Sequence, residues 1–511
     1  MESLLHINSI TFPILSLITF MPIVGAGMLM LIRDDQGIRI FSVIVTLFTF
    51  IMSIPLYVHF DPDLAGFQFV ENKPWVPRFG LTYLMGVDGI SLPLILLTTF
   101  FGPITVLCSW RYIATRVREF MICILLTQGI MVGVFASLDM VLFYIFFEAL
   151  LIPMFLLIAI WGGPRRIYAA IKFVLFTLGG SIFLLLAIIG LYMKAGTFAY
   201  PAMLGLNLTI TWEFWIFLGF LIAFAVKVPM FPVHTWLPAA HVEAPTAGSV
   251  ILASILLKMG TYGLLRFNLA LTPHASVELS PYVLALSVAA ILYGGLLSLA
   301  QSDIKKLIAY SSVSHMGFVT LGIFVLNLQG TQGGMLQMIN HGLTTGGLFL
   351  LAGMLYERTH SRHLDVNAGL GRLMPAFAFF LGLFSLSSLA FPGTASFVGE
   401  FLCLSGAFSF SNKLGAWVIP GALLAAAYMF RIFLRVIWGS GGKIELAADL
   451  NLREWICLSP LALLVIIFGF HPAPLMKIMN PALENLLARL PREGTLSLAT
   501  LFNEISFSVF N

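Results

Sequence analysis

The chain has 511 residues, of which 59% are hydrophobic and 10% are charged, and its formal net charge is +4. Soluble globular domains carry about 25% charged residues, so this composition excludes a soluble fold. The small, dispersed charge gives no indication of a nucleic-acid partner, and a lipid bilayer is the expected surrounding. The four cysteines stand far apart without a CxxC pair, and no glycine-rich nucleotide loop occurs, so neither a cofactor site nor a metal site is expected in this chain.

Apolar runs of about 20 residues recur along the chain and predict an all-α polytopic membrane protein. The runs are continuous rather than alternating, which disfavours a β-barrel. In chain order, about fourteen transmembrane helices are expected at 11–32, 39–58, 86–110, 119–136, 139–160, 168–193, 211–237, 247–268, 281–300, 307–327, 333–356, 374–408, 415–438 and 454–471.

The two ends of the chain and the twelfth run have features of their own. The first run lacks a preceding basic region and a clear cleavage site, so we interpret it as a retained helix. The twelfth run, 374–408, is too long for one straight helix and contains a Pro392-Gly393 pair. The segment 474–511 predicts a short amphipathic surface helix.

Basic residues in the loops predict the orientation of the chain in the membrane. The loops that follow odd-numbered spans hold 17 Lys and Arg residues, Lys305 and the pair Arg165 and Arg166 among them, whereas the opposite loops hold 8, including Arg266. Because positive charge is retained in the cytoplasm, the 17-charge loop face is expected to be cytoplasmic and both termini periplasmic.

Ionisable residues stand inside several of the expected spans. A charge at the centre of a membrane helix costs about 2.5–3.5 kcal/mol on insertion scales, so it usually has a function. The structural alternative is a set of buried ion pairs and hydrogen-bonded histidines that fix helix packing. Six such residues distributed over six helices favour a proton relay instead: Glu148, Lys227, Lys258, Glu400, His315 and His341.

Prolines predict that two of these helices are broken. Pro229 and Pro232 leave backbone carbonyls without intrahelical donors on either side of Lys227, where water is expected. Pro392, which stands eight residues before Glu400, likewise leaves a backbone carbonyl without an intrahelical donor. The two breaks are five helices apart, and a five-helix repeat must be inverted in the membrane, so the pair predicts a transport path. The alternative is two unrelated proline kinks.

At this point the sequence resembles a known family. The stretches AFAVKVPMFPVHTWLPAAHVEAPTAGSVILASILLKMGTYGLLRF and FFEALLIPMF are similar to the proton-translocating module shared by the antiporter-like subunits of respiratory complex I and the multisubunit cation/proton antiporters. The resemblance covers about residues 80–440. The M-type (chain 4) subunits of NADH-quinone oxidoreductase carry glutamate on the second broken helix, where the L and N types carry lysine. Glu400 therefore indicates the M type.

The resemblance implies a division of the chain. It implies two inverted five-helix repeats, each containing a broken helix. The first repeat would span 119–268, with its break near 227–232, and the second 281–438, with its break near 392–394. Three helices in 1–118 would precede the repeats, and 439–511 would supply the last transmembrane helix and the tail.

The resemblance also implies roles in proton translocation. Glu148 would be the partner of Lys227 in the first half-channel, Lys258 the central connecting lysine and Glu400 the terminal proton site. His315 and His341 would line the route between them, and His234 would lie near the first half-channel. His241 and Glu243, at a helix boundary, are expected to lie in a solvated loop.

No redox motif accompanies these residues, so electron transfer is expected in partner subunits. The resemblance implies a complex that contains NADH, FMN, iron–sulfur clusters and quinone, with L- and N-type subunits as neighbours. The length of the chain favours a bacterial inner (plasma) membrane. Three alternatives remain: a D-type subunit of a Na⁺/H⁺ antiporter, a photosynthetic-type plastoquinone oxidoreductase chain 4, and a structural scaffold subunit.

Overall fold

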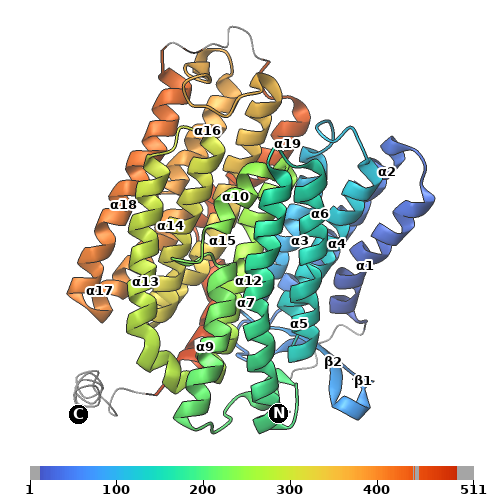
Figure 1. Ribbon diagram of the computed structural model, residues 1–511, viewed down its shortest axis with the longest axis vertical. Helices are drawn as coiled ribbons and strands as arrows, with labels where there is room; N and C mark the ends of the chain where they lie inside the picture. The colour runs from blue at the N-terminus through green and yellow to red at the C-terminus, as the bar shows by residue number, and fades with distance from the viewer. Residues whose placement is uncertain (1–11, 441, 443–447, 492–511) are drawn as a thin grey trace.

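The computed structural model describes residues 12–440, 442 and 448–491, and it is a bundle of roughly parallel and antiparallel helices (Figure 1). The first expected span is helical from Ile14, and the helix expected in 474–511 is present at Ala473–Leu487, whereas the rest of that segment from residue 492 onward lies outside the described residues. In the N-terminal part the elements are α1 (Ile14–Met28), η2 (Leu29–Leu31), α2 (Asp35–Val58), β1 (Gln68–Val76), η3 (Pro77–Phe79), β2 (Leu81–Val87) and α3 (Ser91–Cys108).

The middle of the chain combines long helices with runs of short helical segments. They are α4 (Val117–Ala136), α5 (Met140–Ala149), α6 (Leu151–Trp161), α7 (Arg166–Ala195), α8 (Tyr200–Met203), α9 (Ile210–Lys227), α10 (Trp236–Glu243), α11 (Thr246–Ile251), η4 (Leu252–Leu256), α12 (Leu257–Gly263) and η5 (Leu264–Leu269).

The remaining elements complete the bundle. They are α13 (Pro273–Leu299), α14 (Ile304–Phe324), α15 (Leu328–Thr359), η6 (Leu370–Arg372), α16 (Pro375–Ser388), α17 (Ala395–Phe410), α18 (Asn412–Phe433), η7 (Leu434–Trp438), α19 (Leu452–Phe470) and α20 (Ala473–Leu487).

The described helices confirm the polytopic all-α class. Among the described residues, 13 helical stretches are long and apolar enough to cross a membrane. The shorter apolar helices α16 and α17 together occupy the twelfth expected span, divided where Pro392 predicts a break. The hairpin β1–β2 was not predicted, because its residues are too few and too mixed in polarity to stand out beside the membrane spans.

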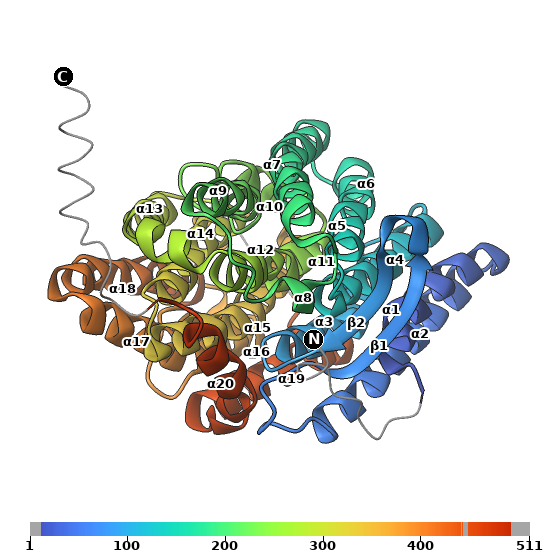
Figure 2. The same ribbon diagram turned by 90° about the horizontal axis from the view of Figure 1, so that it is seen from below.

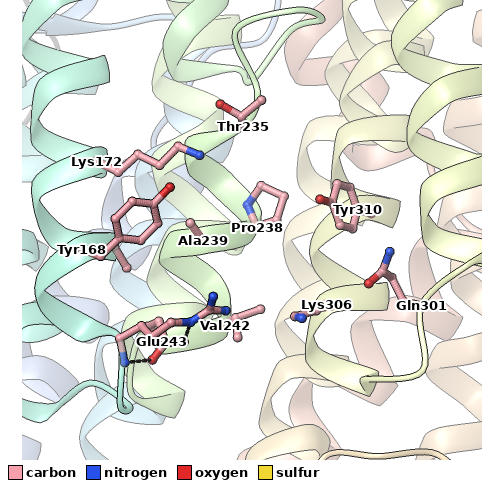
Figure 3. A pocket seen from close by; sticks show the side chains of 12 residues that line it. Tyr168, Lys172, Thr235, Pro238, Ala239, Val242, Glu243, Gln301, Lys306 and Tyr310 are labelled. Carbon is pink, nitrogen blue, oxygen red and sulfur yellow. Dashed lines mark hydrogen bonds and ion pairs between the residues drawn. The ribbon is translucent and has the colours of Figure 1, made fainter.

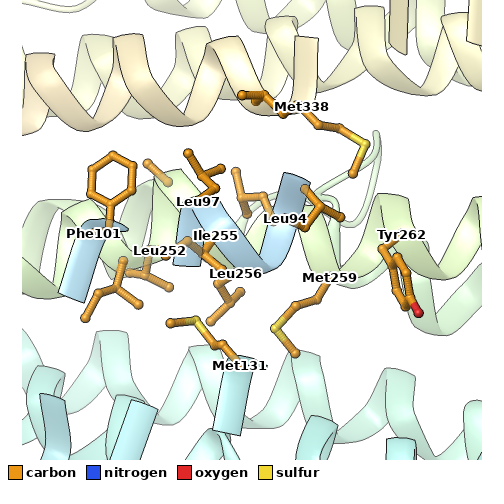
Figure 4. Packing of buried hydrophobic residues seen from close by; sticks show 14 of the residues in the cluster. Leu94, Leu97, Phe101, Met131, Leu252, Ile255, Leu256, Met259, Tyr262 and Met338 are labelled. Carbon is orange, nitrogen blue, oxygen red and sulfur yellow. The ribbon is translucent and has the colours of Figure 1, made fainter. Parts of the chain in front are cut away.

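Two helical stretches are shielded from the surroundings by the rest of the bundle. In the stretch Thr246–Leu269 and in helix α15, an 18-residue window is entirely buried, and seen from below the two lie near the middle, with α1 and α2 at one edge and α18 at the other (Figure 2). Leu97 and Phe101 of α3, Met131 of α4 and Met338 of α15 belong to the same buried apolar cluster as Leu256 (Figure 4). This dense packing fixes the stretch that carries Lys258.

The first break differs from its expected form. Helix α9 ends at Lys227 and α10 begins at Trp236. The carbonyl of Ala225, which Pro229 leaves free, accepts the Met230 N–H at 2.8 Å, and the indole of Trp236 donates to the Val226 carbonyl at 2.8 Å. The prediction that freed carbonyls attract water here is therefore wrong for Ala225, since the folded chain satisfies that carbonyl itself.

A buried ion pair ties the N-terminal helices to the central stretch. Asp88, between β2 and α3, accepts two hydrogen bonds from Arg266 of η5, at 2.8 and 2.6 Å. The guanidinium also lies 5.1 Å from the ring centroid of Phe67 and 5.2 Å from that of Tyr262. Arg266, placed in a loop by the sequence analysis, is thus buried, because an aromatic enclosure and a carboxylate compensate its charge.

We expect Asp88→Asn to destabilise the subunit by about 3–5 kcal/mol, because it leaves the buried guanidinium unpaired. The thermal unfolding midpoint of the purified complex measures this effect. Asp365→Asn is the control, because Asp365 pairs with Arg435 on the exposed surface. Equal midpoints for the two variants would contradict the prediction.

Candidate functional site

A buried carboxylate is held between helices in the second half of the chain. Glu400 of α17 accepts from Nδ1 of His315 at 2.7 Å and from the side-chain amide of Gln337 at 2.8 Å. Nε2 of His315 lies 3.1 Å from the Ser388 hydroxyl and 3.2 Å from that of Tyr428. If Nδ1 donates to the carboxylate, Nε2 of the neutral ring is an acceptor for these hydroxyls, so the ring can relay a proton between its two sides.

The central lysine has two partners. Nζ of Lys258 donates to the carbonyl of Ala253, five residues earlier, at 2.5 Å, and lies 2.7 Å from Nδ1 of His341. The carbonyl is accessible because Leu252–Leu256 is π-helical, which opens the regular ladder next to the lysine. A helical segment of this kind was not predicted from the sequence.

These residues form one row across four helical segments. The ring centroids of His341 and His315 are 5.8 Å apart, and Nε2 of His341 has no hydrogen-bond partner among the described residues. The row runs from Lys258 through His341 and His315 to Glu400. The structure therefore brings together four of the seven residues that the sequence singled out.

The expected pair in the first half is not in contact. Lys227 is 1% exposed, and within the described part of the chain its Nζ has no hydrogen-bond partner. The ammonium lies 4.6 Å from the ring centroid of Phe147. Glu148 is beside Ser181 of α7 and interacts with Lys227 only as a charge at longer range.

His234 lies in the irregular segment between α9 and α10. Its ring is buried, stacks on Phe231 at 5.9 Å between centroids, and meets Tyr293 edge-on at 5.4 Å. Lys172 of α7 is close enough to influence its charge. The structure thus places His234 near the first break but apart from the row.

His241 and Glu243 do not lie in a solvated loop, and that prediction is wrong. His241 of α10 is 0% exposed, stacks on Phe349 with centroids 4.5 Å apart, and neither ring nitrogen has a partner among the described residues. The half-helix is packed inside the bundle, which a polar HVE sequence next to prolines does not reveal. The feature of the sequence that could have indicated burial is the set of apolar residues around His241, namely Trp236, Leu237 and Val242.

Lys305 is a second residue that the sequence analysis assigned to a loop. It is the second residue of α14, it is buried, and its Nζ donates to the Ala244 carbonyl at 2.5 Å. His241 lies within electrostatic range of both Lys305 and Lys258. His241 and Lys305 therefore extend the buried row from Lys258 toward the 17-charge loop face.

A cavity of about 260 Å³ opens between α7, α10 and α14 (Figure 3). Lys172 and Tyr168 point into it from one side and Tyr310 from the other. At its base, Glu243 accepts the Arg165 N–H at 2.9 Å and forms an ion pair with the side chain of Arg165 at 3.7 Å. The cavity thus gives the loop face access to the region around α10.

Among the described residues, no group of three or more His, Cys, Asp and Glu side chains is arranged to hold a metal ion.

The multi-pass fold and its buried row of ionisable residues define an antiporter-like membrane subunit. The family model described as NADH:quinone oxidoreductase/Mrp antiporter matches residues 137–425. The chain is 44% identical to NADH-quinone oxidoreductase subunit M of Rhodobacter capsulatus, over 96% of this chain and 99% of that protein. It is 43% identical to NADH-ubiquinone oxidoreductase chain 4 of Chondrus crispus, over 93% and 97%. The chain belongs to the NADH-quinone oxidoreductase subunit M (chain 4) family.

Solved structures agree with this placement. A chain of respiratory complex I from Thermus thermophilus superposes with a TM-score of 0.87 at 32% identity, covering 94% of this chain and 100% of that one. A chain of the Mrp complex from Dietzia reaches 0.81 at 20% identity, covering 97% of this chain and 59% of its own length. At that identity the second likeness shows a shared fold alone, so the antiporter alternative has less support.

Proposed function

We propose that this chain is a proton-translocating membrane subunit of NADH-quinone oxidoreductase, driven by electron transfer in partner subunits. The observation that supports this most directly is the row of Lys258, His341, His315 and Glu400, in which the two ends are hydrogen-bonded pairs and the two histidine rings between them lie 5.8 Å apart by their centroids. All four side chains are buried inside the helical bundle, and in a membrane protein an ionisable group so placed has a high cost unless it carries a function.

The row would connect two half-channels. Lys227 and Glu148, with His234 nearby, would load the first, and Glu400 would exchange protons at the end of the second. The division into inverted repeats at 119–268 and 281–438 is part of the same proposal. It is supported by the two breaks, at 228–235 and 389–394, since Lys227 directly precedes the first and Glu400 lies six residues after the second.

Cofactors and neighbours are proposed for the assembled complex. NADH, FMN, iron–sulfur clusters and quinone would be bound by partner subunits, and L- and N-type subunits would flank this chain. The bacterial inner membrane is the proposed location, with the 17-charge loop face in the cytoplasm and the termini in the periplasm. Co-purification with flavin, iron–sulfur signals and quinone reductase activity tests the assignment, whereas a redox-silent complex with sodium-dependent proton movement would support the antiporter alternative.

Lys227→Ala and Glu148→Ala are each expected to abolish the contribution of this subunit to proton pumping and to slow coupled turnover. Each change removes one of the two charges whose approach and separation would control the lysine proton. Proton-to-electron stoichiometry in reconstituted vesicles is the measurement. Lys413→Ala, at an exposed position on α18, is the control. Normal stoichiometry in either Lys227→Ala or Glu148→Ala would remove that residue from the path.

A further inference from the structure

The ammonium of Lys227 is seated on an aromatic ring. Its Nζ lies 4.6 Å from the centroid of Phe147 and 6.0 Å from that of Phe173. No hydrogen-bond acceptor reaches this nitrogen among the described residues. The side chain is 1% exposed, so bulk solvent does not supply an acceptor either. The face of Phe147 is therefore a source of negative potential in direct reach of this charge.

Phe147 and Glu148 offer this lysine two different partners. They are consecutive residues of α5, so their side chains leave the helix about 100° apart. Helix α5 ends at Ala149, because Pro153 has no N–H to donate to that carbonyl, and α6 begins at Leu151. The two partners thus lie in the last turn of an interrupted helix, next to one long and flexible lysine.

The two partners differ in what they can do chemically. A carboxylate attracts the ammonium and can also take a proton from it, whereas a phenyl ring attracts the ammonium but accepts no proton. A lysine seated on the ring keeps its proton while the carboxylate is free to change its own protonation state. If the Lys227 ammonium alternates between the ring and the carboxylate, its charge can move in one step and its proton can be transferred in another.

We propose that Phe147 is a positioning residue for proton translocation, and that its ring face is the second seat of the Lys227 ammonium when the lysine leaves Glu148. The inference rests on the proposed function of Lys227, and it identifies where the ammonium lies after it has moved away from Glu148. The structure described here represents the state in which the ring is occupied, because Lys227 contacts Phe147 and forms no ion pair with Glu148.

The deciding experiment introduces mono-, di- and trifluorinated phenylalanine at position 147 in the full complex. Fluorine withdraws π-electron density while leaving the shape of the ring nearly unchanged, so each step weakens the attraction of the ring for a cation. We expect the rate of coupled proton pumping to fall stepwise, to a loss on the order of tenfold for the most fluorinated ring. The matched control is the same series at Phe143, which packs on Phe147 with centroids 5.6 Å apart. No cation lies over Phe143 among the described residues, so a flat series is expected there.

Phe147→Leu, compared with Phe143→Leu, gives a second measurement, with larger loss of pumping expected at position 147. If either leucine variant fails to assemble, the fluorinated series decides the question. Equal pumping across the Phe147 series, in a complex where Lys227→Ala is inactive, would overturn the role of Phe147 and leave the proposed function intact. Normal pumping by Lys227→Ala would overturn both.

Discussion

Lys258→Met is expected to reduce proton translocation through this subunit by about 100-fold or more, since a positioned proton-transfer group typically contributes that much. Methionine has nearly the same length and no proton to give, so the change removes the chemistry while filling the volume. Nδ1 of His341 would lose its partner at 2.7 Å, and the row would end one group short of the first half-channel. Proton pumping in reconstituted vesicles, compared with redox turnover, measures the effect.

The stability of the Lys258→Met complex separates mechanism from folding. Lys258 forms no ion pair among the described residues, so its replacement by an apolar residue of similar size leaves no buried counter-charge unpaired, and assembly is expected to be retained. Lys194→Met is the control, because Lys194 is an exposed lysine near the end of α7 that lies 4.4 Å from the Trp212 ring. Full pumping by Lys258→Met in an assembled complex is the result that would break the proposed row.

The energy required of this row can be compared with what its groups supply. Movement of one charge against 150–200 mV costs about 3.5–4.6 kcal/mol. A change of one unit in proton affinity corresponds to about 1.4 kcal/mol, so a swing of about three units suffices. Buried lysines vary over that range when a carboxylate approaches or withdraws. The arrangement around Lys227, with a ring on one side and Glu148 on the other, offers such a change of surroundings.

Hydropathy was sufficient to predict the spans and to single out the charged residues within them. The cost of burying a charge is a property of one residue and its sequence neighbours, so Glu148, Lys258 and Glu400 stand out without a structure. Both helix breaks could also be predicted, because the missing N–H of a proline is a property of that residue alone.

The contacts could not be predicted in this way, because they depend on how distant helices pack. The seat of Lys227 on Phe147 and the π-helical carbonyl beside Lys258 are set by side-chain packing over tens of residues. The burial of His241 follows from helices far away in the chain, since Phe349 covers its ring. A polar segment next to prolines has the same local pattern in a loop and in a half-helix inside a bundle.

The two halves of the path differ in how completely their charges are satisfied. Glu400 has a histidine and an amide as direct donors, whereas Lys227 has no hydrogen-bond partner among the described residues. A carboxylate that accepts two hydrogen bonds on Oε1 is held in position, and its Oε2, which has no partner among the described residues, can take up a proton without a large displacement of the side chain. An unsatisfied ammonium is the group more readily displaced. Movement of charge is therefore expected mainly in the first half, and proton exchange without large displacement in the second.

Glu400→Gln is the sharpest test of this difference and is expected to block proton release while leaving the structure intact. The amide oxygen of glutamine can still accept from His315 and Gln337, so the packing of α17 should persist. It cannot take up a proton, so the row would have no terminal site, and pumping should fall by about 100-fold. Glu484→Gln, on the exposed side of α20, is the matched control.

Two measurements on Glu400→Gln distinguish a loss of proton translocation from a loss of assembly. Pumping by the intact complex reports on translocation, and the thermal midpoint reports on assembly. An unchanged midpoint with lost pumping is expected, because the amide keeps the hydrogen bonds and removes only the titratable group. Unchanged pumping would show that protons leave by a route that bypasses Glu400. Loss of both would show instead that the carboxylate charge holds α14 and α17 together, which is the structural role of a buried ion pair.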